Sequence, residues 1–109
     1  MSTIVAERVL EFYGDDAVAE GLLRVYAPYK DERFVSWACR FVISWPGYEE
    51  GQVVFGEDSW GALFSVLFAA PRKIAKAPDF IAGRIGMFGQ RLNTVEQVEE
   101  SLRIWKSKP

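Results

Sequence analysis

The chain has no histidine, and its 109 residues include a single cysteine, Cys39. A lone cysteine cannot form a disulfide within the chain, and without histidine or a second cysteine a zinc-type site lacks its usual ligands. The missing histidine also removes the common general base for a serine or cysteine nucleophile. We therefore predict no metal site, no bound cofactor and no catalytic residue, and expect that the protein is not an enzyme.

Long apolar runs are missing too. The longest, from Trp60 to Ala70, is far shorter than the roughly 20 residues that a membrane span requires, and Pro71 ends it. The first residues, Met-Ser-Thr-Ile, are not a basic stretch followed by an apolar segment, so we predict no secretory signal. The expectation is a cytoplasmic protein that does not enter a membrane.

The net charge is only −2, but its distribution is uneven. Residues 1–60 contain five Lys/Arg and eleven Asp/Glu, whereas residues 61–109 contain eight and four. The acids of the first part gather mainly within residues 15–20, 31–32, 49–50 and 57–58. Such groups are most often solvated loops and helix caps; the sharper interpretation is an acidic face that steers a basic partner.

Half of the residues are apolar, with four Trp and eight Phe, which suffices for the core of one domain spanning residues 1–109. Alternating apolar residues predict strands at 3–13, 21–28, 34–45 and 52–55, with Arg8 interrupting the apolar face of the first. Residues 14–17 and 46–51 are predicted turns, and residues 29–33 a polar loop. Strands this close in sequence normally pair, so we predict a four-stranded antiparallel meander.

The apolar period changes at Ser59 and predicts a helix to residue 77, kinked or broken at Pro71. Residues 80–92 contain three glycines, which favour a turn and a short extended segment over a helix; whether they form a strand or a loop stays open. Thr94 and Gln97 form a capping box that opens a final amphipathic helix, with an apolar stripe ending at Trp105. The predicted fold class is therefore α+β, a meander followed by a kinked covering helix and a C-terminal amphipathic helix. The buried stripe of the first helix is expected to comprise Leu63, Val66, Leu67, Ala70 and Ile74, widened by Phe64 and Phe68.

Three polar residues, Glu57, Asp58 and Ser59, separate the last predicted strand from the first helix. Asp58 or Ser59 can accept the free N–H groups of the first helical turn. A catalytic or metal-binding carboxylate pair is the alternative, but adjacent side chains on a turn diverge. We therefore predict that this segment begins a helix.

Two other patterns are weak indications of a ligand. The segment "GRIGMFG" at 83–89 has glycines spaced as in phosphate-binding loops, but it lacks the preceding strand, the following helix and a closing Lys-Ser/Thr. The basic residues between Arg72 and Arg91 favour a solvated face, because the chain is acidic and has no RNA- or DNA-binding signature. We therefore predict no nucleotide and no nucleic acid as ligand.

Large aromatic residues flank the predicted turns. Such residues are enriched at protein interfaces, although the rim of a core suits them as well. Cys39 lies on the apolar face of its predicted strand, where an inert core thiol is favoured over a nucleophile. The predicted partner-binding residues are Asp15, Asp16, Trp45, Tyr48, Glu49, Glu50 and Trp60.

Four short motifs, "AER" at 6–8, Pro28, "WACR" at 37–40 and "GEDSWGAL" at 56–63, extend across most of the chain. Together they resemble a family of small bacterial domains of unknown function with the signature G-x-D-S-x-x-A-L. The kink at Pro71 and the charged C-terminal helix depart from that family. The resemblance implies no activity, cofactor or catalytic residue. In size and acidic character the chain is also similar to immunity proteins, which neutralise a toxin encoded nearby, although such a likeness does not establish function.

The favoured hypothesis is a non-enzymatic protein-interaction module, an immunity-type inhibitor or a regulatory partner, whose protein partner is basic and could be a toxin. The alternative is a small-molecule-binding domain or minor enzyme that uses Asp58 and Arg40 in a pocket between sheet and helix. A third hypothesis is a homo-oligomer formed through an exposed sheet edge or through the apolar stripe from Val95 to Trp105.

Overall fold

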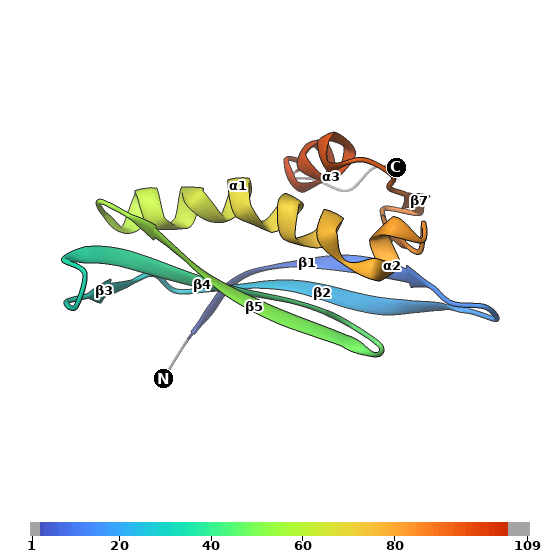
Figure 1. Cartoon of the computed structure of the whole chain (residues 1–109), viewed down its shortest axis with the longest axis horizontal. Coiled ribbons are helices and arrows are strands. Elements are labelled where there is room, and N and C mark those ends of the chain that lie inside the picture. Colours follow the sequence, from blue (N-terminus) through green and yellow to red (C-terminus); the bar gives the residue numbers. More distant parts are fainter. Residues whose placement is uncertain (1–2, 105–109) are drawn as a thin grey trace.

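The computed structural model describes residues 3–104, which form one antiparallel sheet with three helices on one of its faces (Figure 1). The predicted α+β class is therefore confirmed, with seven strands where the sequence predicted four. In chain order the elements are β1 (Ile4–Tyr13), β2 (Val18–Tyr26), β3 (Tyr29–Asp31), β4 (Ser36–Trp45), β5 (Tyr48–Gly56), α1 (Ser59–Lys76), α2 (Pro78–Ile81), β6 (Ile85–Met87), β7 (Gln90–Arg91) and α3 (Val95–Leu102).

The strand β4 is central to the sheet. β5 pairs with it over nine residues, from Trp37 to Trp45, and therefore occupies one edge. On the other side of β4, β3 pairs with the start of the strand and β2 with its second half. Beyond β2 the sheet continues with β1, β6 and β7. β3 lies in the predicted polar loop, because residues 29–31 pair with the start of β4 despite their polar sequence.

Two hairpins are longer than predicted. β2 begins at Val18 and β5 at Tyr48, because the turns that precede them are short. Pro46 and Gly47 alone connect β4 to β5, and Gly47 adopts a φ of 83°, a conformation that favours glycine. Glu49 and Glu50 therefore belong to a strand and not to a turn, so their side chains point to opposite faces of the sheet.

The helix α1 covers β4 and β5 and continues through Pro71. Of the kink or break predicted there, the break is wrong, because Ser59–Lys76 is one continuous helix. The ring of Pro71 is fully buried, so packing against the core offsets the lost backbone hydrogen bond, which costs about 3 kcal/mol in an exposed helix. The buried stripe also differs from the prediction, since it consists of Ala62, Val66, Ala70, Pro71 and Ile74, while Leu67, Phe64 and Phe68 are exposed.

The last third of the chain completes the layer of helices. Residues 80–92 include the end of α2 and a small hairpin of β6 and β7, which extends the sheet beyond β1. The predicted capping box of α3 is confirmed, because the Thr94 side chain accepts from the Gln97 backbone and the Gln97 side chain accepts from the Thr94 backbone. Trp105, predicted to end the apolar stripe of this helix, lies outside the described residues. None of the described helices has both the length and the apolar composition needed to cross a membrane.

Candidate partner-binding surfaces

The seven predicted partner-binding residues occupy opposite ends of the sheet. β1, β2, β4 and β5 are antiparallel neighbours, so the β1–β2 and β4–β5 turns lie at the same end, which we call the hairpin end (Figure 1). This end holds all the predicted residues except Trp60. Trp60 is the second residue of α1, which starts where β5 returns to the other end.

The aromatic residues of the hairpin end are structural. The rings of Trp45 and Tyr48 are stacked, with centroids 4.6 Å apart and planes at 10°. Trp45 is only 5% exposed, and its Nε1–H donates to an Asp79 carboxylate oxygen at 2.8 Å. The Trp45 ring therefore joins the β4–β5 hairpin to α2, and its predicted contact with a partner stays a prediction.

The acids of the hairpin end lie in different surroundings. Asp15 forms an exposed ion pair with Arg84 at 3.0 Å, which partly neutralises it, and Asp16 is exposed at the same turn. Glu50 lies on the helix side of β5, on the same face as Tyr48. Burial raises the pKa of the Tyr48 hydroxyl, and the charges of Glu50 and Asp79 raise it further.

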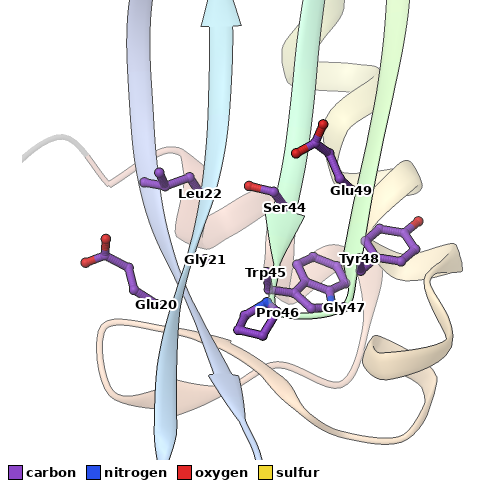
Figure 2. A pocket seen from close by; sticks show the side chains of 9 residues that line it. All are labelled: Glu20, Gly21, Leu22, Ser44, Trp45, Pro46, Gly47, Tyr48 and Glu49. Atoms are coloured by element: carbon purple, nitrogen blue, oxygen red, sulfur yellow. The ribbon is translucent and has the colours of Figure 1, made fainter.

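Glu49 lines a pocket of about 570 Å³ between β2 and the β4–β5 hairpin (Figure 2). β2 and β4 pair as far as Leu22 and Ser44, one residue before β4 ends at Trp45, and the pocket is the surface gap beside and beyond this last pair. Figure 2 shows Glu20 on one side of this gap and Glu49 on the other, with the hydroxyl of Ser44 between them.

This pocket suits a cationic group. Glu20 and Glu49 form no ion pair within residues 3–104, and the Ser44 hydroxyl adds a hydrogen-bonding group. An ammonium or guanidinium group in this pocket would have a carboxylate on either side of it, whereas the described residues contain no cluster of three side chains placed to hold a metal ion. Sequence reasoning placed Glu20 among the acids but could not assign it to a site, since the register of β2 against β4 depends on distant pairing.

Asp58 acts as the predicted helix cap. Its Oδ1 accepts from the backbone N–H of Gly61 at 2.7 Å. Arg40, its proposed partner in a pocket between sheet and helix, lies instead over the Tyr26 ring, 5.2 Å from the centroid, on the strand face that points away from α1. The structure does not bring these two side chains together.

A second surface lies on the N-terminal part of α1, and Trp60 is its only residue that was predicted from the sequence as a partner contact. Trp60, Phe64 and Phe68 are 75%, 61% and 62% exposed, and Leu67 is 50% exposed. Next to them, an apolar groove of about 400 Å³ separates α1 from Ala6 of β1 and Val25 of β2. The sequence contains a pattern that indicates this surface. Residues 60, 64 and 68 form one stripe at a spacing of four, while the smaller Ala62, Val66 and Ala70 form another. The smaller stripe packs closer to the sheet.

Comparison with known proteins identifies the family to which the chain belongs. No curated protein and no solved structure gives a significant match to the chain. A family model, described as a domain of unknown function (DUF6968), matches residues 6–97. This range includes every strand except the first residues of β1, and most of the helical layer. The chain therefore belongs to the DUF6968 family of domains of unknown function.

Proposed function

We propose that the chain is a non-enzymatic protein-interaction module that binds a basic segment of a partner protein at the hairpin end. The observation that carries the proposal is the pocket in Figure 2, where Glu20 and Glu49 flank a gap large enough for a lysine or arginine side chain. Charge-assisted hydrogen bonds to a guanidinium group are among the strongest in proteins, and an arginine can bind a carboxylate through two parallel bonds.

Two further acids of the hairpin end lie outside the pocket lining. Asp16 at the β1–β2 turn and Glu50 on the other side of β5 add negative charge at the same end of the molecule. Complementary charge of this kind accelerates association and selects the partner more than it adds affinity. Binding should therefore weaken as the salt concentration rises.

The pocket wall is held in place before any partner binds. The Trp45–Tyr48 stack and the hydrogen bond from Trp45 to Asp79 fix the β4–β5 hairpin against α2. At the opposite wall, Gly21 lies so close to β4 that an added Cβ would be 2.6 Å from the Ser44 carbonyl oxygen. A rigid wall reduces the entropy that binding must overcome.

The test is a capture experiment with the full chain and a matched control. The double variant Glu20→Gln/Glu49→Gln should lose the partner that the wild type recovers from native cell extract. Glu96→Gln/Glu100→Gln makes the same charge change on exposed residues of α3 and should retain it. Equal recovery by both variants, or no recovered protein at all, would contradict the proposal.

The finer proposal is an immunity-type inhibitor, supported by the small size and the acidic hairpin end. Its partner would be a basic toxin encoded by a neighbouring gene. Co-expression with that gene product should restore growth with the wild type and not with Glu20→Gln/Glu49→Gln. Failure of the wild type to protect would leave a regulatory partner as the remaining form of the proposal.

The groove between α1 and the sheet favours a second candidate, a domain that binds an apolar small molecule. Its volume of about 400 Å³ falls within the usual range for ligand pockets, but only apolar residues line it. Polar groups normally fix a ligand's orientation, so this candidate predicts low selectivity. A thermal-shift screen with fatty acids and aromatic compounds tests it, and a melting temperature unchanged by all of them would remove it.

A further inference from the structure

The exposed face of α1 is an apolar surface for which the proposed interaction at the hairpin end has no use. Trp60, Phe64 and Phe68 follow one another at a spacing of four residues and are all more than half exposed. α3 lies beside the C-terminal part of α1 and reaches Val66 and Leu67 through Leu102. The side of α1 that carries the three aromatic residues is nevertheless exposed (Figure 1). Contiguous apolar surface of this kind normally marks a binding site.

We propose that a second copy of the chain covers this face, with the two α1 helices antiparallel and crossing near Phe64. A two-fold axis there places Trp60 of one copy opposite Phe68 of the other. The same pair of contacts then occurs twice, as a symmetric dimer requires.

The charges around α1 select this orientation. Glu57 precedes the helix and is exposed, while Arg72 follows Phe68 and lies over its ring, 3.7 Å from the centroid. Glu57 is seven residues before Phe64 and Arg72 is eight residues after it, so antiparallel helices bring Glu57 of one copy to Arg72 of the other. Parallel helices would instead place like charges together, which disfavours binding.

The available area predicts a weak dimer. An aromatic side chain buries about 150–250 Å², so three that are 61–75% exposed contribute about 400 Å² per copy. Leu67 and the apolar groove beside it increase this area. Two copies then reach roughly the lower limit of specific interfaces, which is about 1,200 Å² in total. We therefore expect dissociation in the micromolar range.

Sedimentation of the full chain over a wide concentration range tests the dimer. The mass should rise from that of one 12.4 kDa chain towards twice this value. Phe64→Asp should keep the protein monomeric, whereas the control Ile81→Asp, at a residue of α2 that is 75% exposed, should leave the dimer intact. Unchanged melting curves would show that both variants fold.

A charge exchange tests the orientation. Glu57→Lys and Arg72→Glu should each weaken the dimer at least fivefold, and the two changes together should restore it, because the pair then reforms with reversed signs. Arg72 also lies 3.6 Å from Glu99, so melting curves must show that α3 stays packed. A wild type that is monomeric at millimolar concentration, a dimer that survives Phe64→Asp, or a charge exchange without restoration would each overturn the proposal. None of these outcomes affects capture at the hairpin end, which tests the proposed function separately.

Discussion

Single residues explain the segment "GEDSWGAL" at 56–63. Gly56 has no room for a side chain, because an added Cβ would collide with the backbone of Gly61 and Ala62. Asp58 caps the helix at Gly61, whose own Cβ would be 3.2 Å from the capping oxygen. These residues bring the first turn of α1 against the end of β5, so the segment serves the fold.

The helix cap at Asp58 can be tested by mutation. Replacing Asp58 with alanine removes the acceptor for the Gly61 N–H and should lower the free energy of unfolding by about 1 kcal/mol. Asp58→Ser keeps an acceptor at the cap position, so its free energy of unfolding should fall much less. Urea denaturation of the three proteins measures the difference, and equal stability for Asp58→Ala and the wild type would show that the cap contributes nothing.

Asp31 gives a pH-dependent prediction. The side-chain hydrogen bonds from Arg33, with the guanidinium 3.1 and 3.2 Å from the two carboxylate oxygens, hold the pKa of Asp31 below its usual value. A lowered pKa stabilises the fold above the pKa of the unfolded chain, and this contribution is lost as the pH falls through the folded value. In Arg33→Gln the pKa of Asp31 should rise towards normal.

An NMR titration of the Asp31 carboxyl carbon measures this change. Arg24→Gln, which removes the cation paired with Glu7, is the control and should leave the pKa of Asp31 unchanged. The difference in unfolding free energy between the wild type and Arg33→Gln should also shrink in acid, where Asp31 is protonated in both proteins. A titration curve that is identical in the wild type and in Arg33→Gln would contradict the assignment.

At the scale of elements, local patterns in the sequence predicted much of the structure. Alternation located β1 and β4, and the caps at Asp58 and Thr94 were recognisable because each depends on residues within one turn. The exposed stripe of α1 was not predicted, since Phe64 and Phe68 are as apolar as any core residue. What decides burial there is that α1 presents alanine and valine to the sheet, and this packing depends on the distance between two elements.

The candidate site was predicted only in part for a related reason. The hairpin end and Glu49 follow from the order of strands and turns, whereas the pairing of Leu22 with Ser44, which brings Glu20 to the same pocket, is a long-range register. The structural role of Trp45 was not predicted, because its hydrogen-bond partner, Asp79, is 34 residues away in the chain.

Arg8 illustrates how one element anchors another. It interrupts the apolar face of β1, and its guanidinium donates to the carbonyl oxygens of Ser101 and Ile104 at 3.0 and 2.6 Å, at the C-terminal end of α3. A cation there satisfies carbonyl groups that a helix end leaves without partners. The charge in the apolar strand face thus fastens α3 to the sheet.

This contact gives a prediction for α3. Arg8→Met keeps an unbranched apolar stem but removes the guanidinium and both hydrogen bonds, so α3 should open more readily. We expect hydrogen exchange of its amides to accelerate about tenfold, which corresponds to about 1.4 kcal/mol. Arg24→Met, at a residue paired with exposed Glu7, is the control and should leave α3 unchanged. Equal exchange rates in all three proteins would show that α3 does not depend on Arg8.

At the scale of the whole molecule, the two proposed surfaces lie at opposite ends of α1. The helix has 18 residues and, at about 1.5 Å per residue, is about 27 Å long. The apolar face extends over the first ten residues of this helix, and Asp79, which holds the hairpin end through Trp45, follows its last turn. The antiparallel dimer would therefore leave both hairpin ends free for partners.

This separation predicts that self-association and partner binding are independent. Phe64→Asp should abolish the dimer and change the affinity for the captured partner less than twofold, whereas Glu20→Gln/Glu49→Gln should do the reverse. Effects of distant sites without shared contacts normally add, so a combined variant should show both losses and no more. Sedimentation of the wild type with its partner should reveal two copies of each chain. If Phe64→Asp lowers the affinity for the partner tenfold, then the partner contacts α1 directly or binds only the dimer. A change in binding free energy of that size requires a physical connection between the two ends.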